Sequence, residues 1–294
     1  GGRSSQQSEA KLCFRKSNRK WVTLIRHGQS KAQVAPKGTR KELLYLDAAL
    51  TRKGVGQAEH LSAKVVPPEL VVISNLSRAL QTACLLFKNH HPGVKMLSTP
   101  VVCELGSIPE NTPRTLAELR KDPNVASLPG FDRIDFSEVR AFEEERKQGK
   151  KKPTSSSPSS SSTTGQTAPP TSSFSTTTTK TDTHKINKRG EDRKKNGSAS
   201  SRSRHSAAYA CQRFLEWLER RPETFLTLVG HSTFMRKLTG NATRVDNCDP
   251  IEIVISTSGV RIISQEERAK AWSEFSVSSG AGAKSTCTAK SSVD

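Results

Sequence analysis

The chain has 294 residues, of which 33% are hydrophobic and 5% are aromatic, and its formal net charge at pH 7 is +19. Three polar stretches (residues 1–20, 146–205 and 276–294) carry about +17 of that charge, which leaves about +2 for the remaining residues. The basic composition is therefore a property of the polar stretches, and we expect no nucleic-acid partner. No run of about 18 apolar residues occurs, so the sequence contains no candidate membrane-spanning helix.

The N-terminal segment, residues 1–20, is basic and is expected to be disordered. If a methionine precedes Gly1, residues 1–5 match the M-G-x-x-x-[ST] pattern of N-myristoylation. An acyl chain beside a basic patch is the two-signal arrangement that attaches a protein to a membrane surface. The alternative is that Gly1-Gly2-Arg3 is only an arbitrary chain end, which would have the same sequence. The basic residues of this patch are Lys11, Arg15, Lys16, Arg19 and Lys20.

The folded part is predicted to be one domain over residues 21–275. Three apolar, β-rich runs (residues 21–25, 70–73 and 224–229) alternate with helical patterns, which is typical of buried parallel strands joined by crossover helices. One helix is expected after Thr51, which would cap it, a second after residue 77, and a third over residues 207–221. Residues 251–256 and 260–263 resemble a hairpin. We therefore predict an α/β three-layer sandwich, with a mostly parallel central sheet, an antiparallel edge strand and flanking helices.

The domain is interrupted by a Ser/Thr- and Lys/Arg-rich segment over residues 146–205, and residues 276–294 form a second polar tail. Residues 154–179 contain 19 Ser or Thr among 26 residues, which is too polar to bury a core. We expect a disordered insert, which is either a solvated insertion or a phosphorylatable, basic interaction segment.

The six cysteines show no paired C-x-x-C spacing. Cys84 and Cys211 fall in apolar helical patterns and are expected to be buried. A disulfide framework or a structural zinc site is not predicted, and the composition is typical of a reduced, cytoplasmic protein.

Basic side chains follow all three predicted strands. Arg26 and His27 come after the first, Arg78 after the second and His231 after the third. Ligands of open parallel sheets bind at the carboxyl ends of the strands, and four potential cations there would repel one another without an anion. Arg78 also falls in the first turn of its helix, where a bound phosphate would offset the unfavourable dipole. Any one of these residues alone could simply lie at a loop, but together they predict a phosphate pocket.

Histidine at two strand ends suggests a nucleophile, because a neutral imidazole can form a phosphohistidine. Gly28 leaves room where backbone and phosphate would approach. No metal-ligand spacing is present, so the site is predicted to need no metal. Glu104 is the best-placed proton donor for a leaving alkoxide. The equal alternative is that Glu104 is only an exposed carboxylate in a loop.

The motifs resemble those of the histidine phosphatase superfamily, the phosphoglycerate-mutase-like fold. Four ordered segments between residues 21 and 263 carry the resemblance. They are Arg26-His27-Gly28-Gln29-Ser30, the D-x-x-L-T-x-x-G-x-x-Q-A pattern from Asp47 to Ala58, the segment from Ser74 to Ala83, and Gly230-His231-Ser232 with Asn247.

The resemblance implies that His27 is phosphorylated, that Arg26, Arg78 and His231 bind the phosphate, and that Glu104 donates the proton. Gly28, Gln33 and Ser232 would be further substrate contacts. The resemblance also implies that the site needs no metal and no organic cofactor. The chain departs from the family at Gln33, where asparagine is common, and at Asn75, where proline is common.

The activity predicted is hydrolysis of a phosphorylated small molecule or a phosphoprotein, because the segment after Glu104 lacks the lid sequence of the mutases. A mutase-type phosphotransferase and a non-catalytic phospho-ligand binding protein are the alternatives. Arg114 is a candidate substrate contact.

Overall fold

The computed structural model describes residues 19–89, 94–104, 106, 108–149, 207–241 and 244–278, and its centre is a seven-stranded sheet. The spatial order of the strands is β4-β3-β2-β5-β1-β6-β7. Their bounds are β1 Lys20–Arg26, β2 Leu70–Ser74, β3 Lys95–Thr99, β4 Ile134–Asp135, β5 Phe225–Gly230, β6 Pro250–Ser256 and β7 Gly259–Ile262.

The sheet is parallel from β4 to β1 and antiparallel at β6 and β7. β1 lies beside β5 with Arg26 opposite Gly230, so the carboxyl ends of these two strands coincide. The three predicted strands and the hairpin are confirmed. β3 and β4 were not predicted, since their short runs carry too few apolar residues to stand out.

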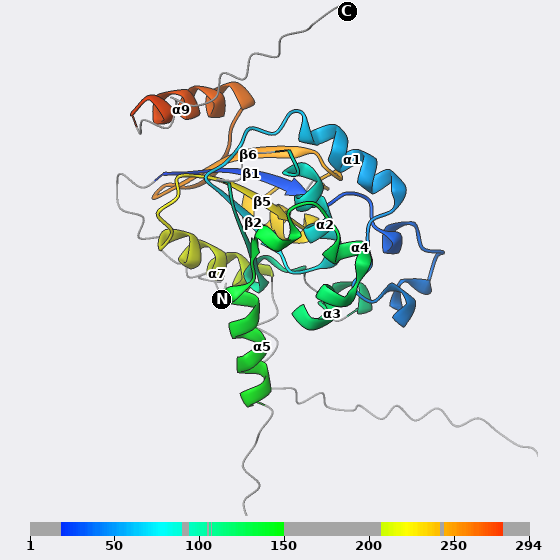
Figure 1. Cartoon of the computed structure of the whole chain (residues 1–294). Coiled ribbons are helices and arrows are strands. Elements are labelled where there is room, and N and C mark those ends of the chain that lie inside the picture. Colours follow the sequence, from blue (N-terminus) through cyan, green and yellow to red (C-terminus); the bar gives the residue numbers. More distant parts are fainter. Residues whose placement is uncertain are drawn as a thin grey trace, which may run out of the picture.

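Helices cover both faces of the sheet, as the predicted three-layer sandwich requires. The α-helices are α1 Arg52–Ser62, α2 Ser77–Leu86, α3 Leu116–Lys121, α4 Pro123–Ala126, α5 Ser137–Gly149, α7 Ala207–Glu219, α8 Ser232–Thr239 and α9 Gln265–Ser278. The 3-10 helices are η1 Lys31–Val34, η2 Thr39–Lys41, η3 Leu43–Tyr45, η4 Pro100–Val102, η5 Pro109–Asn111 and η6 Phe131–Arg133. Figure 1 shows α1 and α9 on one side of the sheet and α7 on the other.

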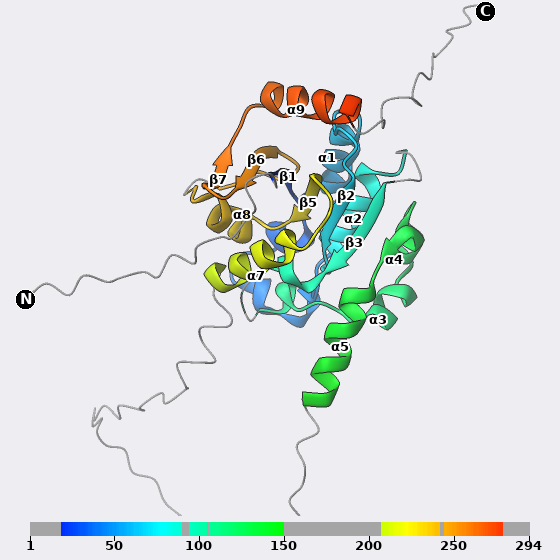
Figure 2. The ribbon, with the colours of Figure 1, turned by 90° about the vertical axis from the view of Figure 1, so that its left-hand side faces the viewer.

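Alternation along the strands divides the core into two clusters. Val22 and Leu24 of β1 pack with Phe214 of α7 and Phe234 of α8 on one face. Ile25 belongs to the cluster on the opposite face, which includes side chains of α1, α2, α3, α4 and α5. In Figure 2, α7 and α8 lie together on one side of the strands, while α3, α4 and α5 lie near β3. Both faces of the sheet are therefore buried, which explains the continuous apolar runs in the sequence.

The helix ends follow from their capping residues and packing partners. The Thr51 side chain accepts a hydrogen bond from the Gly54 amide, which confirms the predicted cap of α1. α9 was not predicted, and it packs Trp272 edge-on against Phe225 with ring centroids 4.9 Å apart.

The predicted limits of the polar stretches need correction. Residues 276–278 belong to α9 and residues 146–149 to α5, so the tail starts later and the insert begins after α5. The rest of the predicted insert and tail, and residues 1–18, lie outside the described residues.

Lys20 does not belong to an exposed basic patch, contrary to the prediction. Its side chain is buried in β1 and donates hydrogen bonds to the carbonyl oxygens of Arg221 and Glu223. Cys84 and Cys211 are buried as predicted. Among the described helices, none is long and apolar enough to cross a membrane.

Candidate active site

The predicted basic residues meet at the carboxyl ends of β1, β2 and β5. Arg26 ends β1, and the His27 amide donates a hydrogen bond of 3.0 Å to the Gly230 carbonyl at the end of β5. Arg26, His27 and Arg78 line a cavity of about 290 Å³, whereas His231 is fully buried and contacts Arg78 without lining it. The residues lining it are Arg26, His27, Ser30, Gln33, Arg78, Glu104, Glu110, Asn111, Ser232, Thr233, Arg236 and Arg244.

His27 is buried and its ring is held in one orientation. Nδ1 lies 2.7 Å from the carbonyl oxygen of Gly28, and a carbonyl can only accept, so Nδ1 carries the proton of the neutral ring. Nε2 therefore has a lone pair, which accepts a 3.2 Å hydrogen bond from Nε of Arg78. Burial, reinforced by the charge of Arg78, holds the pKa of His27 well below its ordinary value. The imidazole is thus neutral, and the lone pair of the ring is on Nε2.

Arg78 is the central cation of the site and occupies the first turn of α2, as predicted. It donates to the carbonyl of Glu110, and its Nη2 lies 3.0 Å from Oδ1 of Asn111. Burial lowers the pKa of Arg78. A buried guanidinium in the first turn of a helix is costly, and an anion bound beside it would offset that cost.

His231 lies opposite His27, with the two ring centroids 5.1 Å apart. Its Nε2 is 2.8 Å from the hydroxyl of Ser74, and its Nδ1 is 3.5 Å from Nη2 of Arg78. Burial is the main cause of its lowered pKa, with the charge of Arg78 second. Since an arginine nitrogen can only donate, Nδ1 accepts and Nε2 carries the proton in the neutral ring.

Arg26 is buried with a free donor. Its Nη1 donates to the Val245 carbonyl at 2.8 Å, while its Nε has no hydrogen-bond partner. Burial, followed by the charge of Arg244, lowers the pKa of Arg26 to about 10. An unsatisfied, desolvated guanidinium next to other cations is the electrostatic signature of an anion site.

The other predicted site residues fall in different places. Glu104, Gln33 and Ser232 line the cavity. The side-chain amide of Gln33 also accepts a hydrogen bond from the Ser30 amide and contacts Asn247, so it stabilises the loop after β1 in addition to lining the cavity. Within the described part of the chain, no three His, Cys, Asp or Glu side chains lie close enough to hold a metal ion.

Gly28 is required for packing and does not line the cavity. A Cβ at this position would lie 2.4 Å from the carbonyl oxygen of Gly54, so the loop after β1 rests directly on α1. We predicted that this glycine allows a phosphate to approach the backbone. The structure shows instead that it allows two backbone segments to approach each other.

Arg114 is placed as a structural residue, contrary to the prediction of a substrate contact. Its Nε lies 3.1 Å from Oδ2 of Asp47 and its Nη1 lies 2.8 Å from Oδ2 of Asp122. Asp47 also accepts hydrogen bonds from the amide and hydroxyl of Ser77 at the start of α2. Arg114 and Asp47 therefore fix the helix that carries Arg78.

Three further residues support the site and were not predicted as site residues. Ser74 contacts His231, Asn111 contacts Arg78, and Nδ2 of Asn247 donates to the His27 carbonyl at 2.5 Å. Asn247 closes the last motif in the sequence, which was a usable signal. Asn111 lies in the loop after Glu104, where spacing alone gives no position.

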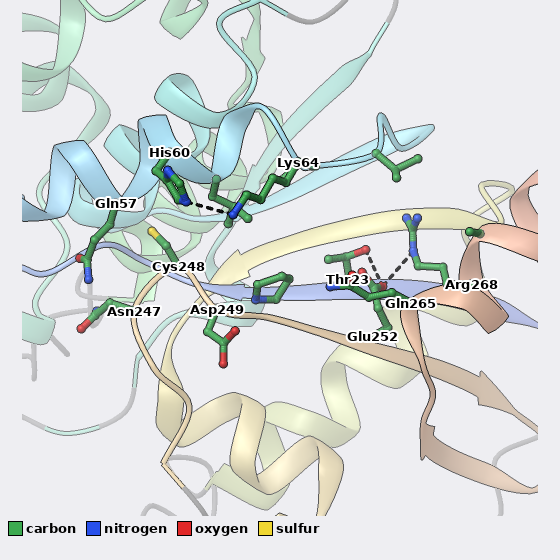
Figure 3. A pocket seen from close by; sticks show the side chains of 15 residues that line it. Thr23, Gln57, His60, Lys64, Asn247, Cys248, Asp249, Glu252, Gln265 and Arg268 are labelled. Carbon is green, nitrogen blue, oxygen red and sulfur yellow. Dashed lines mark hydrogen bonds and ion pairs between the residues drawn. The ribbon is translucent and has the colours of Figure 1, made fainter.

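A second, larger cavity of about 620 Å³ lies between α1, β6 and α9 (Figure 3). It contains none of the basic residues predicted at the strand ends. One arginine, Arg268, lines this cavity and is buried. Its Nε lies 2.9 Å from Oε2 of Glu252, and the same oxygen accepts a hydrogen bond from the Thr23 hydroxyl. Asn247 lines the larger cavity, and its Nδ2 donates a hydrogen bond to the carbonyl of His27, so this side chain lies between the larger cavity and His27.

The solved structures with similarity to this chain include phosphatases and a mutase. An alpha-ribazole phosphatase from Shigella flexneri is 17% identical, with 83% of this chain and 94% of that chain covered and a TM-score of 0.40. The ecdysone phosphate phosphatase from Bombix mori is 15% identical (83% and 92% covered, TM-score 0.43). A phosphoglycerate mutase from Bacillus anthracis is 17% identical (85% and 93% covered, TM-score 0.43). No curated protein sequence matches the chain significantly.

A family model matches the part of the chain that contains β1, α1, β2, α2 and Glu104. The match covers residues 22–147 and is to the histidine phosphatase superfamily, branch 1. The matched segment holds the first three of the four motifs. The fold brings the fourth to the same place, because Ser232 lines the cavity and His231 contacts Arg78. Residues 22–147 of the chain are therefore similar to the histidine phosphatase superfamily, branch 1.

Proposed function

We propose that the protein is a phosphomonoester hydrolase that acts through a phosphohistidine on His27 and needs no metal. The observation that carries this proposal is the environment of His27: a neutral ring whose Nδ1 is held by the Gly28 carbonyl and whose Nε2 faces the guanidinium of Arg78. The substrate is a phosphorylated small molecule or a phosphoprotein.

The reaction proceeds in two displacements. The Nε2 lone pair of His27 attacks phosphorus, the bond between phosphorus and the ester oxygen breaks, and Glu104 gives its proton to the departing oxygen. A water molecule then attacks the phosphohistidine and gives a proton to the Glu104 carboxylate, while the P–N bond breaks and restores the imidazole. Arg26 and Arg78 supply donors to the phosphoryl oxygens throughout, and His231 joins them by turning its Nε2–H from the Ser74 hydroxyl to the phosphoryl group.

The test is phosphate release from p-nitrophenyl phosphate and a panel of small phosphomonoesters, in EDTA, between about pH 5 and 8. His27→Ala should lose activity roughly 10⁴-fold or more, since it removes the nucleophile. His60→Ala is the matched control, because His60 lines the larger cavity and should leave the rate unchanged. Mass spectrometry after an alkaline quench should find the phosphoryl group on His27.

Each alternative has its own result. Labelling of His27 with transfer to an acceptor alcohol, and no net release, would indicate a mutase-type phosphotransferase. Binding of inorganic phosphate without labelling or release would indicate a phospho-ligand binding protein, and release by His27→Ala at the wild-type rate would contradict the proposed nucleophile.

A further inference from the structure

Two arginines line the catalytic cavity that no motif and no step of the proposed reaction uses. Arg236 lies in α8, which starts directly after His231, and the amide of the preceding Met235 bonds to the His231 carbonyl. Arg244 directly precedes Val245, whose carbonyl accepts the hydrogen bond from Arg26. Both side chains are exposed at the rim, whereas Arg26 and Arg78 are buried.

The rim arginines differ from Arg78 in having uncommitted donors. Arg78 uses Nε, Nη1 and Nη2 on protein partners. Among the described residues, neither Arg236 nor Arg244 forms a side-chain hydrogen bond or an ion pair with another residue. Each therefore presents a guanidinium that can bind a carboxylate or a phosphate through two parallel hydrogen bonds.

The charge of the cavity exceeds that of one phosphate. Four arginines and Glu110 give a formal charge of +3 when Glu104 carries the proton that the leaving group needs. A phosphate dianion between Arg26 and Arg78 reduces this charge to +1, so the two rim arginines and Glu110 together still carry one unbalanced positive charge. Arg244 is close enough to Arg26 to disfavour its charged form, so a second anion near Arg244 would relieve that repulsion.

We propose that Arg236 and Arg244 bind a second anionic group of the substrate, so that the preferred substrates are phosphomonoesters with a carboxylate or another phosphate close to the ester. This inference rests on the proposed function for its reaction, although not for its binding step. A cavity of about 290 Å³ is at the small end of ligand sites, which requires the second group to lie a few bonds from the first.

The experiment compares matched substrates that differ in one charge. Phenyl phosphate is paired with 3-carboxyphenyl phosphate, and the monophosphate of 1,3-propanediol with its bisphosphate. These two arms distinguish a carboxylate from a phosphate as the second group. For the wild type, kcat/KM should be at least tenfold higher for the more anionic member of one pair. Arg236→Gln and Arg244→Gln should each reduce that ratio severalfold, and the double variant should bring it close to 1.

Lys237→Ala is the matched control, because Lys237 is an exposed cation on α8 outside the cavity and should leave the ratio unchanged. A wild-type ratio of 1 or less in both pairs would overturn the inference. So would a preference that survives in the double variant, or that Lys237→Ala reduces equally.

A binding measurement separates this inference from the proposed function. Calorimetry with benzylphosphonate and 3-carboxybenzylphosphonate requires no turnover. A tighter Kd for the carboxylated compound, lost in the double variant, would support the rim site even if the protein hydrolysed nothing. Equal Kd values in the wild type would overturn it, whatever the hydrolytic activity.

Discussion

Asn247 lines the larger cavity and hydrogen-bonds to the carbonyl of His27, which lines the smaller one. The two cavities differ in how their buried arginines are neutralised. In the larger cavity Arg268 has a carboxylate partner, Glu252. In the catalytic cavity no carboxylate forms an ion pair with Arg26 or Arg78, within the residues that the structure describes. The two cavities therefore differ in charge more than in volume, and it is the buried arginines without an ion-pair partner that mark the proposed phosphate site.

The largest effect is expected when one buried arginine of each cavity, Arg78 or Arg268, is replaced by lysine. Arg78→Lys should lower kcat/KM by about 10²–10³-fold, because a lysine cannot replace the planar set of donors that reaches the phosphate. Arg268→Lys should leave kcat/KM within about threefold, but should lower the free energy of unfolding by about 1–3 kcal/mol through loss of guanidinium contacts in a buried site. Steady-state kinetics and urea unfolding of both variants provide the two readouts.

The comparison breaks if the two variants behave alike. An Arg268→Lys protein that is fully stable but catalytically impaired would give the larger cavity a role in the reaction. An Arg78→Lys protein with wild-type kcat/KM would remove Arg78 from the phosphate site.

The strand ends were predictable from sequence because both faces of the parallel sheet are covered. Val22, Leu24 and Ile25 form a continuous apolar run that ends at Arg26, and the same holds for the strand before His231. Parallel pairing then brings the ends together, and no other information is needed to expect His27 near His231.

Residues whose partners lie far along the chain could not be predicted in the same way. Arg114 is in a loop where a substrate contact is plausible, but its partner Asp47 is 67 residues away. Lys20 belongs to a basic run, yet carbonyl oxygens more than 200 residues away bury its ammonium. Spacing reports which residues share an element, whereas the contacts of a single polar side chain depend on how loops close over the sheet.

A second prediction uses the two buried histidines, whose environment disfavours protonation. The unfolded chain binds protons at His27 and His231 near pH 6.5, while burial and the neighbouring Arg78 keep the pKa of both rings lower in the folded state. The unfolded state therefore binds more protons as the pH falls below about 6.5, and the free energy of unfolding must fall with it. Each such proton contributes at most about 1.4 kcal/mol per pH unit.

Urea unfolding at pH 7.5, 6.5 and 5.5 measures this dependence. The double variant His27→Asn, His231→Asn should lose less stability between pH 7.5 and 5.5 than the wild type does. Asp47, whose pKa is raised mainly by burial, is present in both proteins and cancels in the comparison. Equal slopes in the two proteins would mean that the histidines are protonated in the folded site, which would remove the neutral nucleophile.

The smallest predicted effect concerns Asn247, which lines the larger cavity and hydrogen-bonds to His27. Its Nδ2 donates to the carbonyl of His27, so it positions the backbone of the nucleophile without contacting a reacting atom. Asn247→Asp keeps the size of the side chain and loses this donor, which is worth about 0.5–1.5 kcal/mol and should lower kcat by about 2–10-fold with little change in KM. Gln265→Ala, in the larger cavity but away from His27, is the control and should leave kcat unchanged. A rise in KM with unchanged kcat in Asn247→Asp would instead place Asn247 in substrate binding. A fall in kcat for Gln265→Ala as well would mean that the larger cavity as a whole supports the loop that carries His27, rather than this one hydrogen bond.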